Sequence, residues 1–267
     1  MLVPLDSPIR KVPTTLKRRD VLYLDGIRYC FEAFELISLR LARTLHTNGQ
    51  RDDNADPLAP QIVEATTDAW SVIDITHRLR ELLQQAPKLK KNDPQLQLFL
   101  RRSGSVEELR HYFQHCRTEI HSFAERGMPL WGTLSWIFGG DSSELPANHL
   151  IVPGTFFDDC RAMGCTFDFQ EHRYTERVVL HAGPKRIDLA DLHDAVKQFV
   201  PYYIKWFETT FTSPERHGSD VHMRLSLRPV QHDASEVADA PNGAEQSHAL
   251  EPAAGSDSDG ESSPPAQ

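Results

Sequence analysis

The sequence predicts an α+β protein, in which an N-terminal antiparallel helical bundle is followed by a small antiparallel sheet with one packed helix and a disordered tail. In the first half, apolar residues recur at three- and four-residue steps, which is typical of amphipathic helices. In the second half, short β-branched and aromatic runs are separated by turn residues. We therefore divide the chain into an N-terminal arm (1–19), a bundle (20–127), an α+β unit (128–228) and an acidic tail (229–267).

Four helices are expected in the bundle. The segments DGIRYCFEAFELISLRLARTL and QIVEATTDAWSVIDITHRLRELL each place their large apolar residues on one face, and PQLQLFLR predicts a shorter third helix. Before the fourth helix, Ser105 and Glu108 have the spacing of a capping box. The stripe that this fourth helix should bury consists of Val106, Leu109, Phe113, Cys116, Ile120 and Phe123. Four helices with short links favour an up-and-down bundle.

Strands are expected after residue 127. The predicted strands are LWGTLSWIF, HLIVPGTFF, CTFDFQ, RVVLH and VHMRLSLR, which Gly, Pro, Asp or Asn residues separate. One helix should interrupt them from about Asp191 onward, because apolar residues there again follow helical spacing. Trp131 and Trp136 are expected to dock the sheet onto the bundle, since two free surface tryptophans so close together would be unusual.

The net charge of -9 comes almost entirely from the tail, which contains eight acidic residues and no Lys or Arg. The rest of the chain has 30 acidic and 29 basic residues, a balance that neither excludes a nucleic-acid partner nor favours one strongly. No apolar run approaches the roughly 18 residues of a membrane span, and no secretory signal is recognisable, so we expect a cytoplasmic protein without a membrane partner. Four cysteines without C-x-x-C spacing suggest neither a disulfide framework nor a zinc knuckle.

The stretch VEELRHYFQHCRTEIH contains the candidate functional residues. On one continuous helix, two polar strips would flank the apolar stripe: Arg110, Gln114, Arg117 and His121 on one, and His111, His115 and Glu119 on the other. Histidines at the edge of a buried seam can titrate near neutral pH and transfer protons.

The pattern Arg110-His111-x-x-x-His115 resembles the R-x(4–6)-H motif of the HEPN superfamily, over about residues 20–127. That superfamily consists of small helical bundles, many of them dimeric, whose active members are metal-independent ribonucleases of toxin, defence and RNA-processing systems. The resemblance implies RNA cleavage without metal or other cofactor, an RNA partner and a homodimer. It implies that His115 performs acid/base chemistry on the ribose 2′-hydroxyl and the leaving oxygen, that Arg110 stabilises the phosphate, and that His111 assists or orients.

Four further residues are expected to contact the substrate: Arg117, His121, Asp74 and His77, of which the last two share a face of the second helix. One alternative is a non-catalytic dimerisation or interaction module, in which Arg110 and His115 make structural hydrogen bonds at a bundle or dimer seam. A second alternative is a metal site that combines His111, His115 and Glu119 with Asp74 and His77. The enzyme hypothesis requires Arg110 and His115 to converge on an open cleft.

Overall fold

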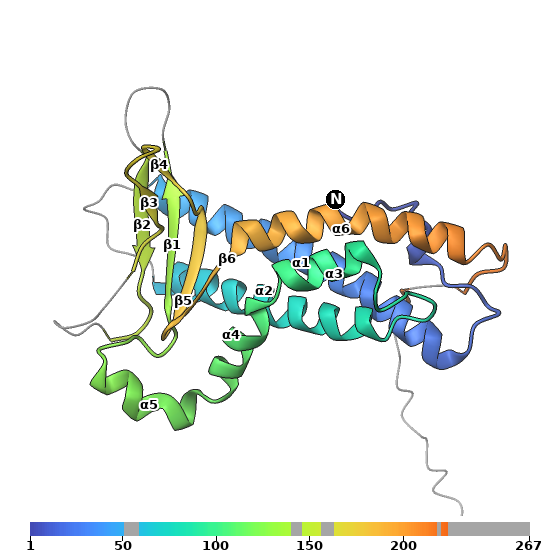
Figure 1. The fold of residues 1–267 in the computed structure, drawn as a ribbon, viewed down its shortest axis with the longest axis horizontal. Coiled ribbons are helices and arrows are strands. Elements are labelled where there is room, and N and C mark those ends of the chain that lie inside the picture. Colours follow the sequence, from blue (N-terminus) through green and yellow to red (C-terminus); the bar gives the residue numbers. More distant parts are fainter. Residues whose placement is uncertain (51–58, 140–145, 156–162, 218–219, 224–267) are drawn as a thin grey trace, which may run out of the picture. The chain divides into compact units, whose positions relative to one another are not determined.

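The computed structural model describes residues 1–50, 59–139, 146–155, 163–217 and 220–223. Residues Met1–Asp220 form one compact unit. The class predicted from the sequence is confirmed: N-terminal helices, a small antiparallel sheet and one later helix make an α+β fold (Figure 1). In the predicted strand VHMRLSLR, residues 221–223 are not a strand, while the remainder lies outside the described residues, as does the predicted tail.

The two longest N-terminal helices, α1 (Arg18–Gly49) and α2 (Ala59–Gln84), form an antiparallel pair. Gly26 faces Leu82, whereas Arg40 forms an ion pair with Asp68, so positions later in α1 meet positions earlier in α2. The predicted apolar stripe of α1 is buried, which explains why this sequence is helical in the folded chain. Both helices were expected from periodicity, and both are present.

Helix α6 (Leu189–Thr210) packs against α3 (Pro94–Arg102) and α1 as well as against the sheet. Phe199 stacks on Phe99 with ring centroids 4.9 Å apart, and Tyr203 lies edge-on to Phe31 at 5.4 Å. Asp188 caps α6 by accepting hydrogen bonds from the backbone amides of residues 190 and 191. The short 3₁₀ helix η1 (Pro8–Arg10) contacts α6 and α1. The helix assigned to the α+β unit therefore shares its core with the bundle helices.

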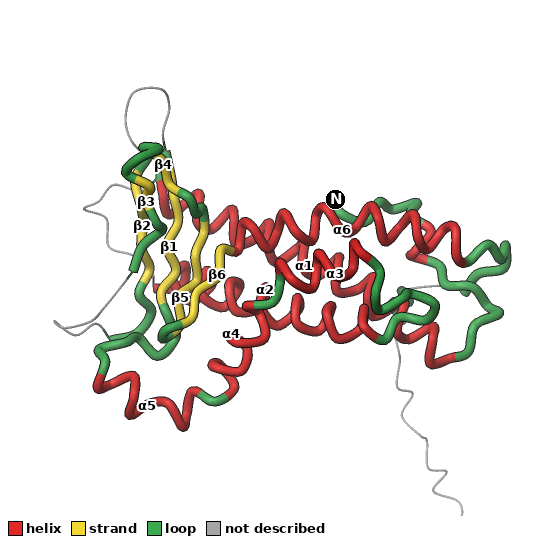
Figure 2. Tube along the Cα trace, viewed as in Figure 1, coloured by secondary structure: helices red, strands yellow, loops and turns green. Residues whose placement is uncertain are grey.

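The main sheet has four antiparallel strands in the order β2-β1-β5-β6, which are Ala147–Ile151, Thr133–Phe138, Val178–Ala182 and Lys185–Asp188. A separate two-stranded ribbon pairs β3 (Phe167–Asp168) with β4 (Arg173–Tyr174) (Figure 2). Strands β4 and β6 were not predicted. Trp136 is buried in the core that the helices also line, whereas Trp131 is 43% exposed.

The predicted fourth helix is two helices, α4 (Ser105–Gln114) and α5 (Cys116–Glu125), with the break at His115. Tyr112 and Phe123 stack at 4.9 Å. Eleven residues apart on a straight helix they would be separated by about 16 Å, so this contact requires the chain to turn. The expectation of one continuous buried stripe is therefore wrong: Val106, Leu109 and Phe123 are buried as predicted, but Ile120 is exposed. The capping box is wrong as well: Gly104 occupies the N-cap, and Glu108 instead forms an ion pair with Lys185.

Candidate functional site

Arg110 points from α4 toward α2 and meets two of the residues predicted to contact substrate. Its Nη1 lies 2.7 Å from His77 Nε2, and its Nε donates to Asp74 Oδ1 at 3.4 Å. The other Asp74 oxygen accepts from Arg78 Nε at 2.7 Å. One carboxylate thus lies between two guanidinium groups. Arg110, Asp74 and His77 form what we call the Arg110 cluster.

His77 is the most enclosed member of the Arg110 cluster. Its side chain is only 13% exposed, and its Nε2 also lies 3.3 Å from Glu81 Oε1. A guanidinium has no acceptor atom, so the 2.7 Å contact requires His77 Nε2 to accept from Arg110. Nδ1 of the same ring is buried and has no hydrogen-bond partner among the described residues. Phosphate stabilisation by Arg110 would have to compete with both of its present partners.

His111 and His115 are exposed, and their rings contact each other with centroids 4.3 Å apart and an interplanar angle of 46°. His115 lies at the junction between α4 and α5, where its carbonyl accepts from the Thr118 amide at 3.0 Å. Among the described residues, neither histidine hydrogen-bonds to Arg110. The structure thus separates the predicted site into two parts: the half-buried Arg110 cluster and an exposed histidine pair.

Arg117 and His121 lie on α5 and are exposed. Because α4 ends at Gln114, they do not continue a helix face from Arg110, and the two predicted polar strips are corrected accordingly. The side chain of Glu119, which belonged to the alternative metal site, lies outside the described residues. In the described part of the chain, no three His, Cys, Asp or Glu side chains converge in a way that could hold a metal ion.

A second arginine, Arg80, connects α2 to the α3–α4 junction one turn after His77. Its guanidinium donates to the Leu100 carbonyl, to Ser103 Oγ at 2.6 Å and to Glu107 Oε1 at 2.7 Å. The hydrogen bond from Arg80 lowers the pKa of Glu107 below its usual range, while partial burial opposes this shift. Arg80 therefore fixes the start of α4 to α2. Arg110, which lies later in α4, makes a second contact with α2 through Asp74 and His77.

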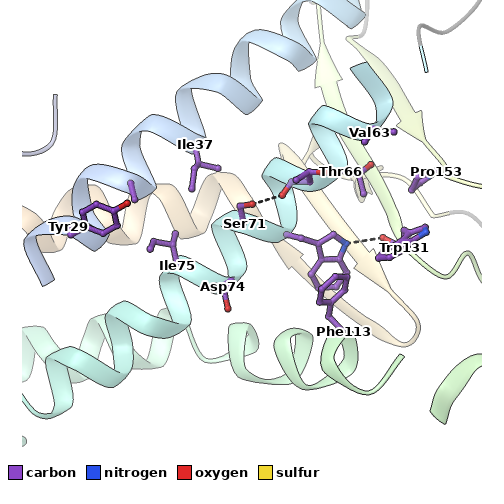
Figure 3. Close-up of a pocket in the computed structure, with 13 residues that line it drawn as sticks. Tyr29, Ile37, Val63, Thr66, Ser71, Asp74, Ile75, Phe113, Trp131 and Pro153 are labelled. Carbon is purple, nitrogen blue, oxygen red and sulfur yellow. Dashed lines mark hydrogen bonds between the residues drawn. The ribbon is translucent and has the colours of Figure 1, made fainter. Parts of the chain in front are cut away.

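An open, apolar groove of about 710 Å³ borders the Arg110 cluster (Figure 3). Helix α1 contributes Tyr29, Ala33 and Ile37 to its lining, and α2 contributes mainly apolar and hydroxyl side chains together with Asp74. At one end, Phe113 stacks on Trp70 at 4.6 Å and lies 5.8 Å from Trp131. Trp70 Nε1 donates to the Trp131 carbonyl at 3.1 Å, which fixes this aromatic wall. Asp74 lines the groove and also belongs to the Arg110 cluster, so the two features adjoin.

The groove was not predicted from the sequence, because its lining is mainly apolar and offers few titratable residues. A usable signal was present in α1: Leu22, Tyr29 and Leu36 are seven residues apart and lie outside the buried stripe. They are 71%, 61% and 64% exposed. A seven-residue apolar repeat on the outer side of a helix is typical of a seam that packs against another helix.

No described helix combines the length and the apolarity required to cross a membrane. Comparisons of the chain with protein-family models, curated proteins and solved structures gave no match.

Proposed function

We propose that this protein is a non-catalytic interaction module that self-associates through the α1–α2 face. The observation that carries the proposal is the pairing of Arg110 with His77 and Asp74 beside an apolar groove. A guanidinium that already has two partners on a neighbouring helix acts as a structural link, and the groove offers binding surface without an arrangement of catalytic groups. The cytoplasmic location expected from the sequence is part of this proposal.

The partner that best fits this face is a second copy of the chain. The exposed residues Leu22, Tyr29 and Leu36 form a ridge about 21 Å long on α1, and Tyr29 also lines the groove. A ridge and a groove on one face are complementary to the same face turned by a two-fold axis, which is the geometry of most homodimers. The seven-residue period matches helices that pack at a shallow angle. Self-association would remove apolar side chains from water on both copies.

Sedimentation velocity over a wide range of protein concentration tests this proposal. Wild type should show a reversible dimer, and Leu36→Glu should be monomeric because it places a charge at one end of the apolar ridge. Leu98→Glu is the matched control, since Leu98 is an exposed leucine on α3. A monomeric wild type at every concentration, or a Leu36→Glu variant that dimerises like wild type, would overturn the proposal.

A second candidate function, metal-independent RNA cleavage, is favoured by one observation: the exposed rings of His111 and His115 lie 4.3 Å apart. Two neighbouring imidazoles could supply the proton acceptor and the proton donor that cleavage through the 2′-hydroxyl needs. In this hypothesis His115 is the acid/base residue and His111 assists it. Arg110 would stabilise the phosphate, but only after it exchanges its present partners.

Incubation of a mixed RNA pool with the protein in EDTA distinguishes the two functions. A ribonuclease should leave 2′,3′-cyclic phosphate ends, and His115→Ala should abolish cleavage. His217→Ala serves as the control because His217 is an exposed histidine outside α4 and α5. Equal cleavage by all three proteins would indicate a contaminant, and no cleavage by folded wild type would refute the enzyme hypothesis.

A further inference from the structure

Basic side chains are concentrated at the end of the helical bundle away from the sheet (Figure 1). Three segments far apart in the sequence meet at this end: 11–20, 88–93 and 205–216. The Thr14 amide donates to the Glu215 carbonyl at 3.2 Å, and Lys88 Nζ lies 4.9 Å from the centre of the Phe211 ring, so all three segments adjoin. The near-balance of charge in the body of the chain therefore conceals an uneven distribution.

The three segments make up about a tenth of the chain and contain nine basic and four acidic residues. We call their nine Lys and Arg side chains the basic end. All nine are exposed except Arg216, which is half-buried. Among the described residues, none of the nine forms an ion pair. Two of the four acidic residues already have other partners, since Asp93 caps α3 and Glu215 accepts from the Thr14 hydroxyl at 3.3 Å.

Elsewhere in the fold, arginines face carboxylates, as Arg80 does at 2.7 Å from Glu107. Arg216 is held differently, because its guanidinium donates to the carbonyls of Phe211 at 2.7 Å and Lys11 at 3.3 Å. Neutral carbonyls fix the position of a cation and leave its charge in place. The like charges of the basic end therefore repel one another in the folded chain, and a bound anion would relieve this repulsion.

The surroundings of the basic end discriminate between classes of anionic partner. None of the large hydrophobic side chains that the described chain exposes lies in these three segments. A membrane surface would be bound through apolar side chains inserted beside the cations, and a protein partner through an apolar or aromatic centre. The phosphodiester backbone of a nucleic acid needs neither, because exposed Lys and Arg side chains neutralise its regularly spaced charges.

We propose that the basic end binds the phosphodiester backbone of a nucleic acid. Phe207 and Phe211, over which Arg216 and Lys88 lie, are buried, so their rings offer no platform on which bases could stack. Affinity therefore depends on the number of phosphates and on salt, and only weakly on sequence. The inference goes beyond the proposed self-association and does not depend on it. It also uses no residue of the Arg110 cluster or of the histidine pair.

Fluorescence anisotropy of a labelled single-stranded RNA and of a labelled duplex DNA, both in EDTA, measures this binding. The tighter of the two identifies the source of the phosphodiester. With about four phosphates contacted, the affinity for RNA should fall about 50-fold between about 50 and 200 mM salt. A basic-end variant combines one change in each segment and should lose about tenfold or more in affinity: Lys17→Glu, Lys90→Glu and Lys205→Glu.

A control variant makes the same change in net charge outside the basic end. It combines three exposed residues: Arg43→Glu, Arg126→Glu and Lys197→Glu. Its affinity should fall less than about threefold, because charges beyond a Debye length of the bound phosphates are screened. Equal urea midpoints of both variants and wild type show that the folded state is retained.

Lysine acetylation of wild type, followed by mass spectrometry, gives a readout that needs no variant. Bound RNA should protect Lys88, Lys90 and Lys91 and leave Lys197 reactive, and this result decides if a variant is destabilised. Absence of binding of both oligonucleotides at about 50 mM salt, or equal losses in the basic-end and control variants, would overturn the proposal. Binding of phosphatidylserine vesicles in place of both oligonucleotides would overturn it in favour of a membrane surface.

Discussion

Replacement of Arg80 tests which interactions fix α4 to the bundle. The Arg80 side chain is 7% exposed, whereas its partner Glu107 is 55% exposed. Arg80→Met retains most of the aliphatic stem but leaves the Leu100 carbonyl and the buried Ser103 hydroxyl without their charged donor. Each buried acceptor left in this way costs about 1–3 kcal/mol, so the variant should lose about 3 kcal/mol of unfolding free energy. Glu107→Gln should lose less than about 1 kcal/mol, because a half-exposed ion pair is screened by water.

Urea unfolding of wild type, both single variants and the double variant measures these losses, with unchanged m-values as the check that the transition is comparable. Arg80→Met should be several times more destabilising than Glu107→Gln. If the two single variants lose the same free energy and the double variant loses no more, the ion pair itself holds α4, and the argument from buried acceptors is refuted.

Three further predictions concern other parts of the fold. Gly183 has φ +58, and a Cβ there would lie 2.6 Å from the Tyr112 ring, so Gly183→Ala should cost about 2 kcal/mol or more in urea unfolding. Gly139→Ala should cost less, because that position has φ +85 but nothing within 4 Å of the added atom. Burial raises the pKa of Cys30 to about 11, so iodoacetamide should label Cys30 in urea but not in the native protein, as mass spectrometry of its peptide can show. Burial lowers the pKa of His181, and the positive charge of Arg186 lowers it further. The unfolded chain therefore binds a proton at this histidine that the folded chain does not bind. The free energy of unfolding should consequently fall as the pH drops through the imidazole range. His181→Leu should flatten this dependence, and urea midpoints that vary with pH equally in both proteins would contradict it.

Periodicity was sufficient where one helix face is buried along its whole length. In α1, Phe31, Phe34 and Leu41 are buried as their spacing predicts. The same logic failed at His115, because Cys116 and Ile120 continue the apolar spacing through a point where the chain turns. The turn is associated with the stacking of Tyr112 on Phe123, a contact between the two helices that a repeat in the sequence does not encode.

Contacts between residues far apart in the sequence also replaced interactions that local motifs predicted. Ser105 and Glu108 have capping-box spacing, yet Glu108 forms its ion pair with Lys185 of β6, at 2.6 Å. Strand β6 itself is a short, mostly charged segment, KRID, and offers too little alternation to be recognised. In both cases the deciding interaction joins residues far apart in the sequence.

In the candidate site, the sequence was enough to select the residues that come together, but not to show how they interact. Shared helix faces were enough to select Asp74, His77 and Arg110 as polar residues of interest, and the fold brings these three together. The sequence cannot show that the guanidinium is already engaged, and this is what changes its expected chemistry. The exposed contact to Asp74 alone would be a weak obstacle to a phosphate, since such pairs contribute less than about 1 kcal/mol. The enclosed contact with His77 is the stronger constraint, so Arg110 links two helices in this structure, and binding an anion would require it to give up that partner.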